Sequence, residues 1–315
     1  MRPKSQQVCL FLASQIRPRW RLQVLASRPG AGIGTGIHVQ GGGCANNVRR
    51  FTNSCYTTNS SAPSGVIHTF DLTTSVSSYD SSSSNSNGPA APRACYQGLV
   101  TDKFSVGDAP NGGYLSCMAI AASKKFASEV SKQRPSQPFQ AQPHVLSLTC
   151  YFNSKTSENA PAELTVEGLG ASKTTFSTSV KISQDNALRC TVSLLFSDLD
   201  KMNGITNLSP EVASLELPTL SECIDATSIL RPLLGKKFVK LQNEIEIMIP
   251  KNDPFNLTTL ERARSGDLFA TAPGGTVASQ TGYVRFDGGR RNIDLDSLVF
   301  FCDALPPPIL NVSPR

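Results

Sequence analysis

The residues best suited to chemistry gather at the start of one predicted helix, in residues 107–123. An Asn111-Gly112-Gly113 turn leads directly into an apolar segment that begins at Tyr114. Glycines let another molecule approach the backbone closely, and the first amides of a helix attract oxyanions and polarised carbonyls. The segment therefore predicts a binding site at the helix start. The alternative is that the glycine pair and Asn111, an ordinary turn former, only turn the chain.

The elements around this turn predict the fold. Apolar residues recur every three or four positions from Gly113 to Ser131 and predict a helix. Four segments with apolar residues at every second position follow within residues 146–196, separated by short polar turns, which is typical of an antiparallel meander. Because the apolar face of a sheet must be covered, we expect the helix to lie against it. A long helix wrapped by a curved antiparallel sheet is the outline of a hotdog fold, in the α+β class.

The first domain is predicted to span residues 66–200. Within it, Thr69–Val76 and Tyr96–Phe104 are predicted to be strands that precede the helix. Residues 77–92 are predicted to form a disordered loop, because the stretch Ser77–Gly88 carries seven serines in twelve residues.

A second, partial domain is predicted at residues 236–315, after a linker at residues 201–235. Alternation at Leu241–Ile249 and Thr276–Phe286 predicts strands, and helical spacing over Ile293–Ala304 predicts a second apolar helix. Only ten residues follow Leu305, so this second unit is expected to lack a meander and to be shortened. Its helix is then expected to expose an apolar face.

Charge is distributed unevenly along the 315 residues. Residues 1–70 contain eight Lys or Arg and no Asp or Glu, whereas the remainder carries 22 basic and 24 acidic residues. The near-neutral body argues against nucleic-acid binding. Residues 1–65 are predicted to be disordered or a targeting segment. An Arg- and Ser-bearing start without acids is typical of a mitochondrial transit peptide, and a start with no targeting role, in a cytoplasmic protein, is the alternative.

Cysteine and histidine usage predicts neither a disulfide framework nor a metal site. The nine cysteines include no Cys-x-x-Cys pair, and Cys117, Cys150, Cys190 and Cys302 fall in apolar patterns that predict buried thiols in a reducing, intracellular compartment. None of the three histidines lies at ligand spacing from a cysteine or carboxylate. No apolar run reaches the length of a transmembrane helix.

Several motifs together resemble the thioesterase-like superfamily, whose members are double-hotdog proteins related to bacterial acyl-CoA thioesterase II, with many fungal members. The motifs are Ala-Pro-Asn-Gly-Gly-Tyr (109–114), Pro-His-Val-Leu-Ser-Leu-Thr-Cys-Tyr-Phe (143–152), Gly-Tyr-Val-Arg-Phe (282–286) and Asp-Leu-Asp-Ser-Leu-Val-Phe-Phe-Cys-Asp-Ala-Leu-Pro-Pro-Pro (294–308). The resemblance covers about residues 66–310 and implies a tandem double hotdog with an incomplete second unit.

The resemblance implies hydrolysis of acyl-CoA to a free acid and CoA by an activated water, without a metal or redox cofactor. The position that matches the family's catalytic carboxylate is Asp303, and a helix-capping role is its alternative. Asn111, Gly112, Gly113 and Tyr114 match the substrate-binding helix start. Arg285 is positively charged and is a candidate contact for a CoA phosphate. The alternative is that it is only a solvated residue of a strand.

The sequence departs from the family where catalysis would be completed. In the family, a Gln and a Thr or Ser from strands after the second helix help to orient the water, and such strands are not matched here. Whether the chain is an enzyme therefore stays open: the alternative is an acyl-thioester-binding or scaffold protein without turnover. The resemblance also implies a homodimer.

Overall fold

The computed structural model describes residues 6–11, 20–25, 35–41, 68–78, 91–133, 142–201, 219–232, 239–251, 279–289 and 291–304, the first three ranges as strands only. They form two compact units. The first unit takes in residues 1–14, 65–204 and 294–304, and the second takes in residues 15–64, 205–293 and 305–315.

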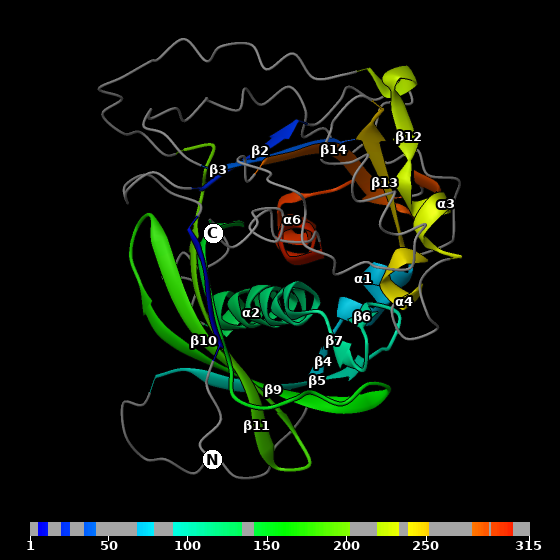
Figure 1. The fold of residues 1–315 in the computed structure, drawn as a ribbon. Helices are drawn as coiled ribbons and strands as arrows, with labels where there is room; N and C mark the ends of the chain where they lie inside the picture. The colour runs from blue at the N-terminus through cyan, green and yellow to red at the C-terminus, as the bar shows by residue number, and fades with distance from the viewer. Residues whose placement is uncertain are drawn as a thin grey trace. The chain divides into compact units, whose positions relative to one another are not determined.

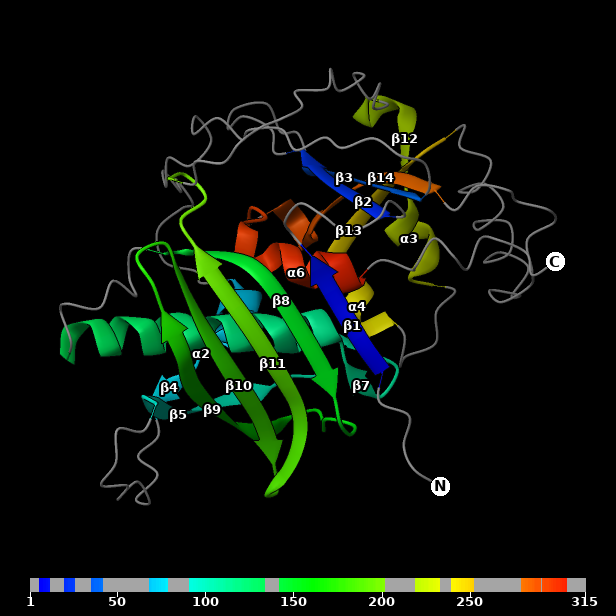
Figure 2. The ribbon, with the colours of Figure 1, turned by 90° about the vertical axis from the view of Figure 1, so that its left-hand side faces the viewer.

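The first unit is built on one long helix, α2 (Gly112–Gln133), which lies within a curved antiparallel sheet (Figures 1 and 2). The sheet has seven strands in the order β1-β8-β11-β10-β9-β5-β4. Their bounds are β1 Gln6–Phe11, β8 His144–Phe152, β11 Ala187–Ser197, β10 Thr175–Gln184, β9 Ala160–Ala171, β5 Arg93–Val100 and β4 Ser77–Ser78. The predicted helix and the four predicted strands after it are confirmed.

The sheet curves because its central strands are irregular. The pairing of β10 shifts at Ser177/Thr178 against β9 and at Ile182/Ser183 against β11. An extra residue on one side of a ladder bends the strand and increases its twist. The sheet can therefore wrap around α2.

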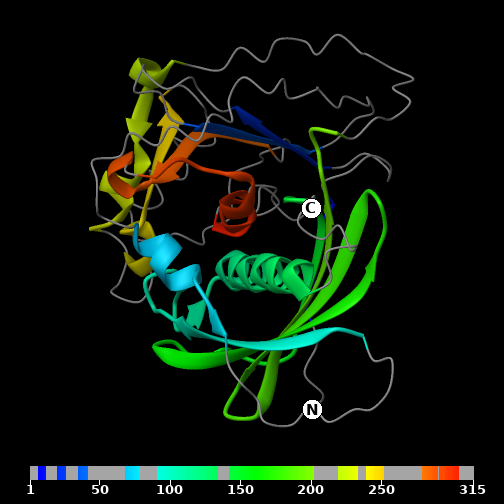
Figure 3. The same cartoon turned by 180° about the vertical axis from the view of Figure 1, so that it is seen from behind.

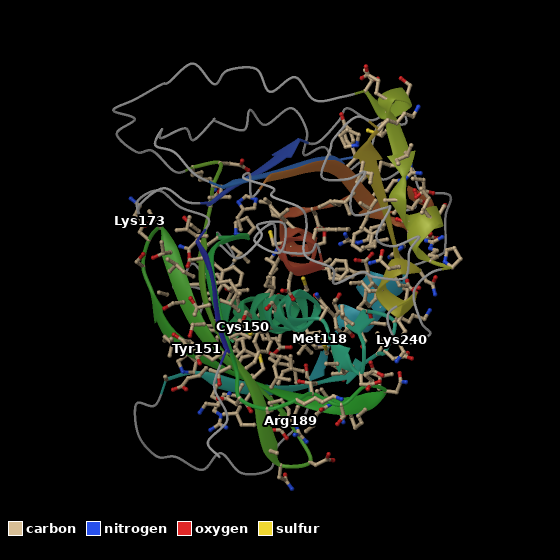
Figure 4. The ribbon with its side chains drawn as sticks, viewed as in Figure 1. Met118, Cys150, Tyr151, Lys173, Arg189 and Lys240 are labelled. Atoms are coloured by element: carbon tan, nitrogen blue, oxygen red, sulfur yellow. The ribbon has the colours of Figure 1, made fainter. Side chains whose placement is uncertain are left out.

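The core lies between α2 and the concave face of this sheet. Met118 on α2 and Cys150 on β8 are buried, whereas the next residue, Tyr151, is 40% exposed, as the period-two alternation predicts (Figure 4). The Ser123 and Thr178 hydroxyls are both fully buried and hydrogen-bond each other at 2.9 Å across the helix–sheet interface. The two polar groups thereby satisfy each other, as burial requires.

The predicted buried thiols are confirmed for Cys117, Cys150 and Cys190, while Cys302 is half-buried. The Cys150 and Cys190 sulfurs lie 3.2 Å apart on the paired strands β8 and β11. The hydrogen bond with the Cys150 thiol, and then burial, raise the pKa of Cys190 far above its usual range.

A second helix, α6 (Leu295–Ala304), covers α2 on the side away from the sheet (Figure 1). Residues 113–120 of α2 are all buried, which is typical of a helix enclosed on every side. The expected exposed apolar face of α6 is therefore wrong, because Val299, Phe300 and Phe301 are all buried in the first unit.

The predicted strand at Thr69–Val76 is also wrong, since the structure has a helix, α1 (Thr69–Thr74), beside α2 and β5 (Figure 3). His68 caps it: its Nδ1 accepts the Phe70 amide at 3.1 Å. The Phe70 ring lies 5.3 Å from both Phe104 and Phe300, so aromatic packing fixes this helix.

The second unit contains a five-stranded sheet in the order β12-β13-β14-β3-β2. Its bounds are β12 Cys223–Asp225, β13 Ile245–Pro250, β14 Ser279–Phe286, β3 Thr35–Gly41 and β2 Trp20–Leu25, with α3 Ala226–Leu230 and α4 Val239–Gln242 beside it. The strands predicted at Leu241–Ile249 and Thr276–Phe286 correspond to β13 and β14, although Leu241 itself lies in α4.

Strands also occupy two regions where the sequence predicted none. The structure places β1, β2 and β3 within residues 1–65, which were predicted to be disordered or a targeting segment; the targeting role stays a prediction. The linker predicted at residues 201–235 contains β12 and α3. Residues 79–90 of the predicted serine-rich loop lie outside the described residues.

Candidate functional site

The start of α2 is fixed by a tight turn and an asparagine cap. Two short strands, β6 (Ser105–Val106) and β7 (Ala109–Pro110), form a hairpin whose turn includes Gly107 at φ 67°. The backbone amide of Asn111 then donates to the Phe104 carbonyl at 2.9 Å, and the side-chain Oδ1 of Asn111 accepts the backbone amide of Tyr114 at 3.0 Å. Asparagine is among the best residues at a helix N-cap for this reason.

Glycine at position 113 allows α6 to approach this helix start. A Cβ atom there would lie 2.7 Å from the Val299 carbonyl oxygen and 2.8 Å from the Phe300 Cα. Both contacts are with backbone, which cannot rotate away. The two helices can therefore meet at this distance only because residue 113 has no side chain.

The close approach brings Asp303 onto the helix start. Its Oδ2 accepts the Gly113 amide at 2.9 Å, and its backbone carbonyl accepts the Asn111 side-chain amide at 3.1 Å. A carboxylate is stabilised at the positive end of a helix dipole. Three predicted site residues that are up to 192 positions apart in the sequence are thus in direct contact.

Phe152, at the end of β8, forms a wall beside this contact. A Cβ atom on Gly112 would lie 2.5 Å from the tip of the Phe152 ring and 3.1 Å from Asp303 Oδ2. The ring and the carboxylate therefore both pack against Gly112. Phe152 was not among the predicted site residues, although it lies in the Pro143–Phe152 motif and ends β8.

The site is open to solvent at its carboxylate. Asp303 is exposed, whereas Asn111 is 5% exposed and Gly113 is buried. An ionised carboxylate has about four acceptor positions, so bonding to Gly113 leaves it able to accept from water. The arrangement can bind a polarised carbonyl at the helix start and hold a base beside it.

Tyr114 lies in the core and not at this surface. Its side chain is fully buried and its hydroxyl donates to the carbonyl oxygens of Thr73 (3.1 Å) and Leu99 (3.3 Å) and accepts the Thr101 amide at 3.3 Å. Burial raises its pKa above the usual value. The geometry gives the Tyr114 side chain a structural role in place of the predicted substrate contact.

Arg285 belongs to the second unit, whereas the other predicted site residues belong to the first. Its guanidinium pairs with Glu246, which also accepts the Gly288 amide at 2.7 Å. The side chain is exposed but already has a carboxylate partner on the neighbouring strand. The predicted phosphate contact has no further support in this geometry.

A cluster of His144, Asp198 and Asp200 has ligand atoms within 4.8 Å of one another. The Nδ1 of His144 accepts the Leu199 amide at 3.1 Å, so a neutral imidazole carries its proton on Nε2 and offers no lone pair there. Asp198 pairs with Lys201 at 2.7 Å. These partners explain the cluster without a metal ion.

Comparison with known proteins agrees with this fold. Residues 100–197 match the family model described as the acyl-CoA thioesterase N-terminal domain. No match was found among curated proteins.

Among the helices of the described residues, none is both long and apolar enough to cross a membrane.

Solved structures resemble the chain over most of its length. A candidate thioesterase II from Thermobifida fusca is 20% identical, with a TM-score of 0.54 over 77% of this chain and 76% of that one. A protein of unknown function with a hotdog fold from Alicyclobacillus acidocaldarius is 16% identical, with a TM-score of 0.47 over 78% and 72% of the two chains. The long helix within a curved antiparallel sheet, together with the likeness to the Thermobifida fusca structure, defines an α+β hotdog fold, and residues 100–197 are acyl-CoA thioesterase-like.

Proposed function

We propose that this protein hydrolyses acyl-CoA thioesters, with Asp303 activating a water at the start of α2. The observation that carries this proposal is the 2.9 Å hydrogen bond between Asp303 Oδ2 and the Gly113 amide. It joins the two motifs that could do the chemistry although they lie 190 positions apart.

The reaction follows from the groups at the helix start. When water attacks the thioester carbonyl, its oxygen gains negative charge, which the Gly112 amide and the helix dipole stabilise. Asp303 accepts the proton that the attacking water loses. The carbon–sulfur bond then breaks, the free acid forms, and the CoA thiolate leaves and takes the proton that Asp303 had accepted, which restores the carboxylate. The reaction consumes no redox equivalent.

A second function, acyl-thioester binding without turnover, is favoured by a different aspect of the same contact. The Gly113 amide could itself polarise a carbonyl, but it is already occupied by Asp303. The Gln and the Thr or Ser that the family resemblance implies are not assigned to any described residue. A binding protein needs only the helix start and the wall formed by Phe152.

We also propose the tandem arrangement that the resemblance implies. Strand β14 precedes α6 in the chain as β5 precedes α2, which supports a second helix–sheet repeat. Homodimerisation and a mitochondrial location stay predictions.

The test is CoA release by the full chain, measured with a thiol reagent over acyl-CoAs from two to sixteen carbons. The Asp303→Asn variant should lose about 10²–10⁴-fold in kcat. Asp200→Asn is the control: it removes another exposed carboxylate of the first unit and none of the contacts between α2 and α6, so it should retain the wild-type rate. Equal rates for wild type and Asp303→Asn would exclude Asp303 as the base.

Calorimetry with the same acyl-CoAs separates the two functions. Binding by a folded wild-type chain that releases no CoA would replace hydrolysis with the binding function. A folded chain that neither binds nor hydrolyses any of these thioesters would contradict both.

A further inference from the structure

The Asn111 side chain links the two helices that form the site. It is 5% exposed and uses both ends of its amide: Oδ1 accepts the Tyr114 amide at the start of α2, and Nδ2 donates to the Asp303 carbonyl at the end of α6. The first amides and last carbonyls of a helix have no partner within the helix. One side chain thus completes the N-terminus of α2 and the C-terminus of α6.

This link acts on the residue that carries the carboxylate. The Asn111 side chain bonds the backbone carbonyl of Asp303. The backbone amide of Gly113, two positions further along, bonds the side-chain carboxylate of Asp303. Asp303 is otherwise exposed on the last turn of its helix, where a carboxylate is disfavoured by the dipole of α6. The backbone link therefore fixes the end of α6 where Oδ2 can reach the Gly113 amide.

We propose that Asn111 is a positioning residue that keeps the Asp303 carboxylate on the Gly113 amide, and that it does not bind substrate. This inference rests on the proposed function, in which Asp303 is the base. The buried Asn111 amide has its acceptor and one donor committed to protein groups, so its reach to a substrate is limited. Its effect on the reaction passes through Asp303.

Substitutions can separate this role from simple helix capping. Serine and aspartate are as good as asparagine at an N-cap, because each offers an acceptor oxygen to the first turn. Neither offers an amide donor of the same length, and a carboxylate has no donor at all. Asn111→Ser and Asn111→Asp should therefore keep the cap of α2 and lose the link to Asp303, whereas Asn111→Ala should lose both.

The experiment follows the Gly113 amide by NMR in the full chain as pH is varied, with Asp303→Asn as the reference. In the wild type, the Gly113 proton and nitrogen shifts should follow ionisation of the Asp303 carboxylate, and Asp303→Asn should abolish this response. We expect Asn111→Ser and Asn111→Asp to lose most of the response while the unfolding midpoint stays close to that of the wild type. This readout does not depend on catalysis.

Kinetics of acyl-CoA hydrolysis supply the second readout. Misplacing a reacting group by about 1 Å can cost about 100-fold in rate, so kcat should fall by about that factor in both variants with KM changed less than about threefold. A wild-type response of Gly113 and a wild-type kcat in both variants would reduce Asn111 to a helix cap. A raised KM with unchanged kcat would instead make Asn111 a substrate contact.

The hydrolysis of acyl-CoA and the positioning role of Asn111 can be contradicted independently of each other. If the wild type hydrolyses no thioester, the proposed function falls, and the Gly113 response in Asn111→Ser still decides whether Asn111 positions Asp303. If hydrolysis depends on Asp303 but Gly113 responds equally in every Asn111 variant, the positioning role falls and the function stands.

Discussion

Lys124 on α2 and Asp296 on α6 form an ion pair, with Nζ 2.6 Å from Oδ2 and 2.8 Å from Oδ1. The Cys117 thiol donates to the Asp296 carbonyl at 3.2 Å in the same region. This pair joins the start of α6 to the middle of α2, whereas Asn111 and Asp303 join the start of α2 to the end of α6. The helices are thus fastened at two separate points.

Removing the ion pair should cost little stability. Both side chains are about a third exposed, with 37% and 34% of their surfaces accessible, so water screens their attraction. We expect Lys124→Met to lower the free energy of unfolding by about 1 kcal/mol or less. Urea denaturation at low and high salt measures this, and the difference between the proteins should shrink in salt. A loss of several kcal/mol would show that the pair is critical for docking of α6.

Gly113→Ala should destabilise the first unit more strongly. The new methyl would overlap with the backbone of Val299 and Phe300, so α6 must move away from α2. Overpacking of this kind costs about 1–3 kcal/mol. Gly170→Ala is a matched control, because the nearest atom to its new methyl would be 3.9 Å away. Equal unfolding midpoints for the two variants would contradict the close approach.

Gly112→Ala should affect the site more than the fold. Its methyl would meet the tip of the Phe152 ring and Asp303 Oδ2, so both side chains would be displaced. We expect kcat for acyl-CoA hydrolysis to fall by about tenfold or more, since displacement of a base disrupts its alignment. Adding Phe152→Leu should recover part of the loss. Hydrolysis at the wild-type rate by Gly112→Ala would place the reaction elsewhere.

Tyr114→Phe tests whether this residue is structural. The change leaves the buried Thr101 amide without the hydroxyl acceptor and the Thr73 and Leu99 carbonyls without its donor. A buried group that loses its partner costs about 1–3 kcal/mol, so the unfolding midpoint should fall. KM for acyl-CoA should not change. A raised KM with unchanged stability would restore the substrate contact that the sequence predicted.

Cys302 should be unreactive at neutral pH although it is only half-buried. Burial, and then the charge of the adjacent Asp303, raise the pKa of its thiol from about 9 to about 12. Its alkylation rate, followed by peptide mass spectrometry, should rise about tenfold per pH unit between pH 8 and 10, because only the thiolate reacts.

The raised pKa of Cys302 also makes the free energy of unfolding depend on pH. Between about pH 9 and 12 the unfolded chain loses the Cys302 proton while the folded chain retains it, so this thiol's contribution to stability is present below pH 9 and is lost as pH rises through 12. Rapid alkylation of Cys302 in the folded protein at pH 7 would contradict the shift.

The helix and the meander could be predicted because their patterns are local. The apolar spacing of α2 and the alternation along β8 to β11 follow directly from which side chains face one core. The strand predicted at Thr69–Val76 failed for the opposite reason. Its β-branched residues favour a strand, but the Thr74 hydroxyl bonds the Phe70 carbonyl within a helical turn at 2.8 Å, and contacts with distant aromatic rings stabilise α1.

The site could be predicted residue by residue but not as an arrangement. Gly112 and Gly113 were identified from the glycine pair at a predicted helix start, but Asp303 only by resemblance to a family, since no local pattern joins positions 190 apart. The approach of α6 to α2 depends on the absence of a side chain at Gly113, and the roles of Asn111 and Phe152 depend on which groups lie opposite them. Such information exists only once the chain has folded.

The position of α6 also affects how the protein is made. It belongs to the first unit, yet about a hundred residues separate its start at Leu295 from the end of β11 at Ser197. A ribosome adding about 5–20 residues per second needs about 5–20 s to synthesise that interval. During this time the apolar side of α2 that receives α6 has emerged without its cover. A nascent chain paused there is the form of this protein that a chaperone would be expected to bind.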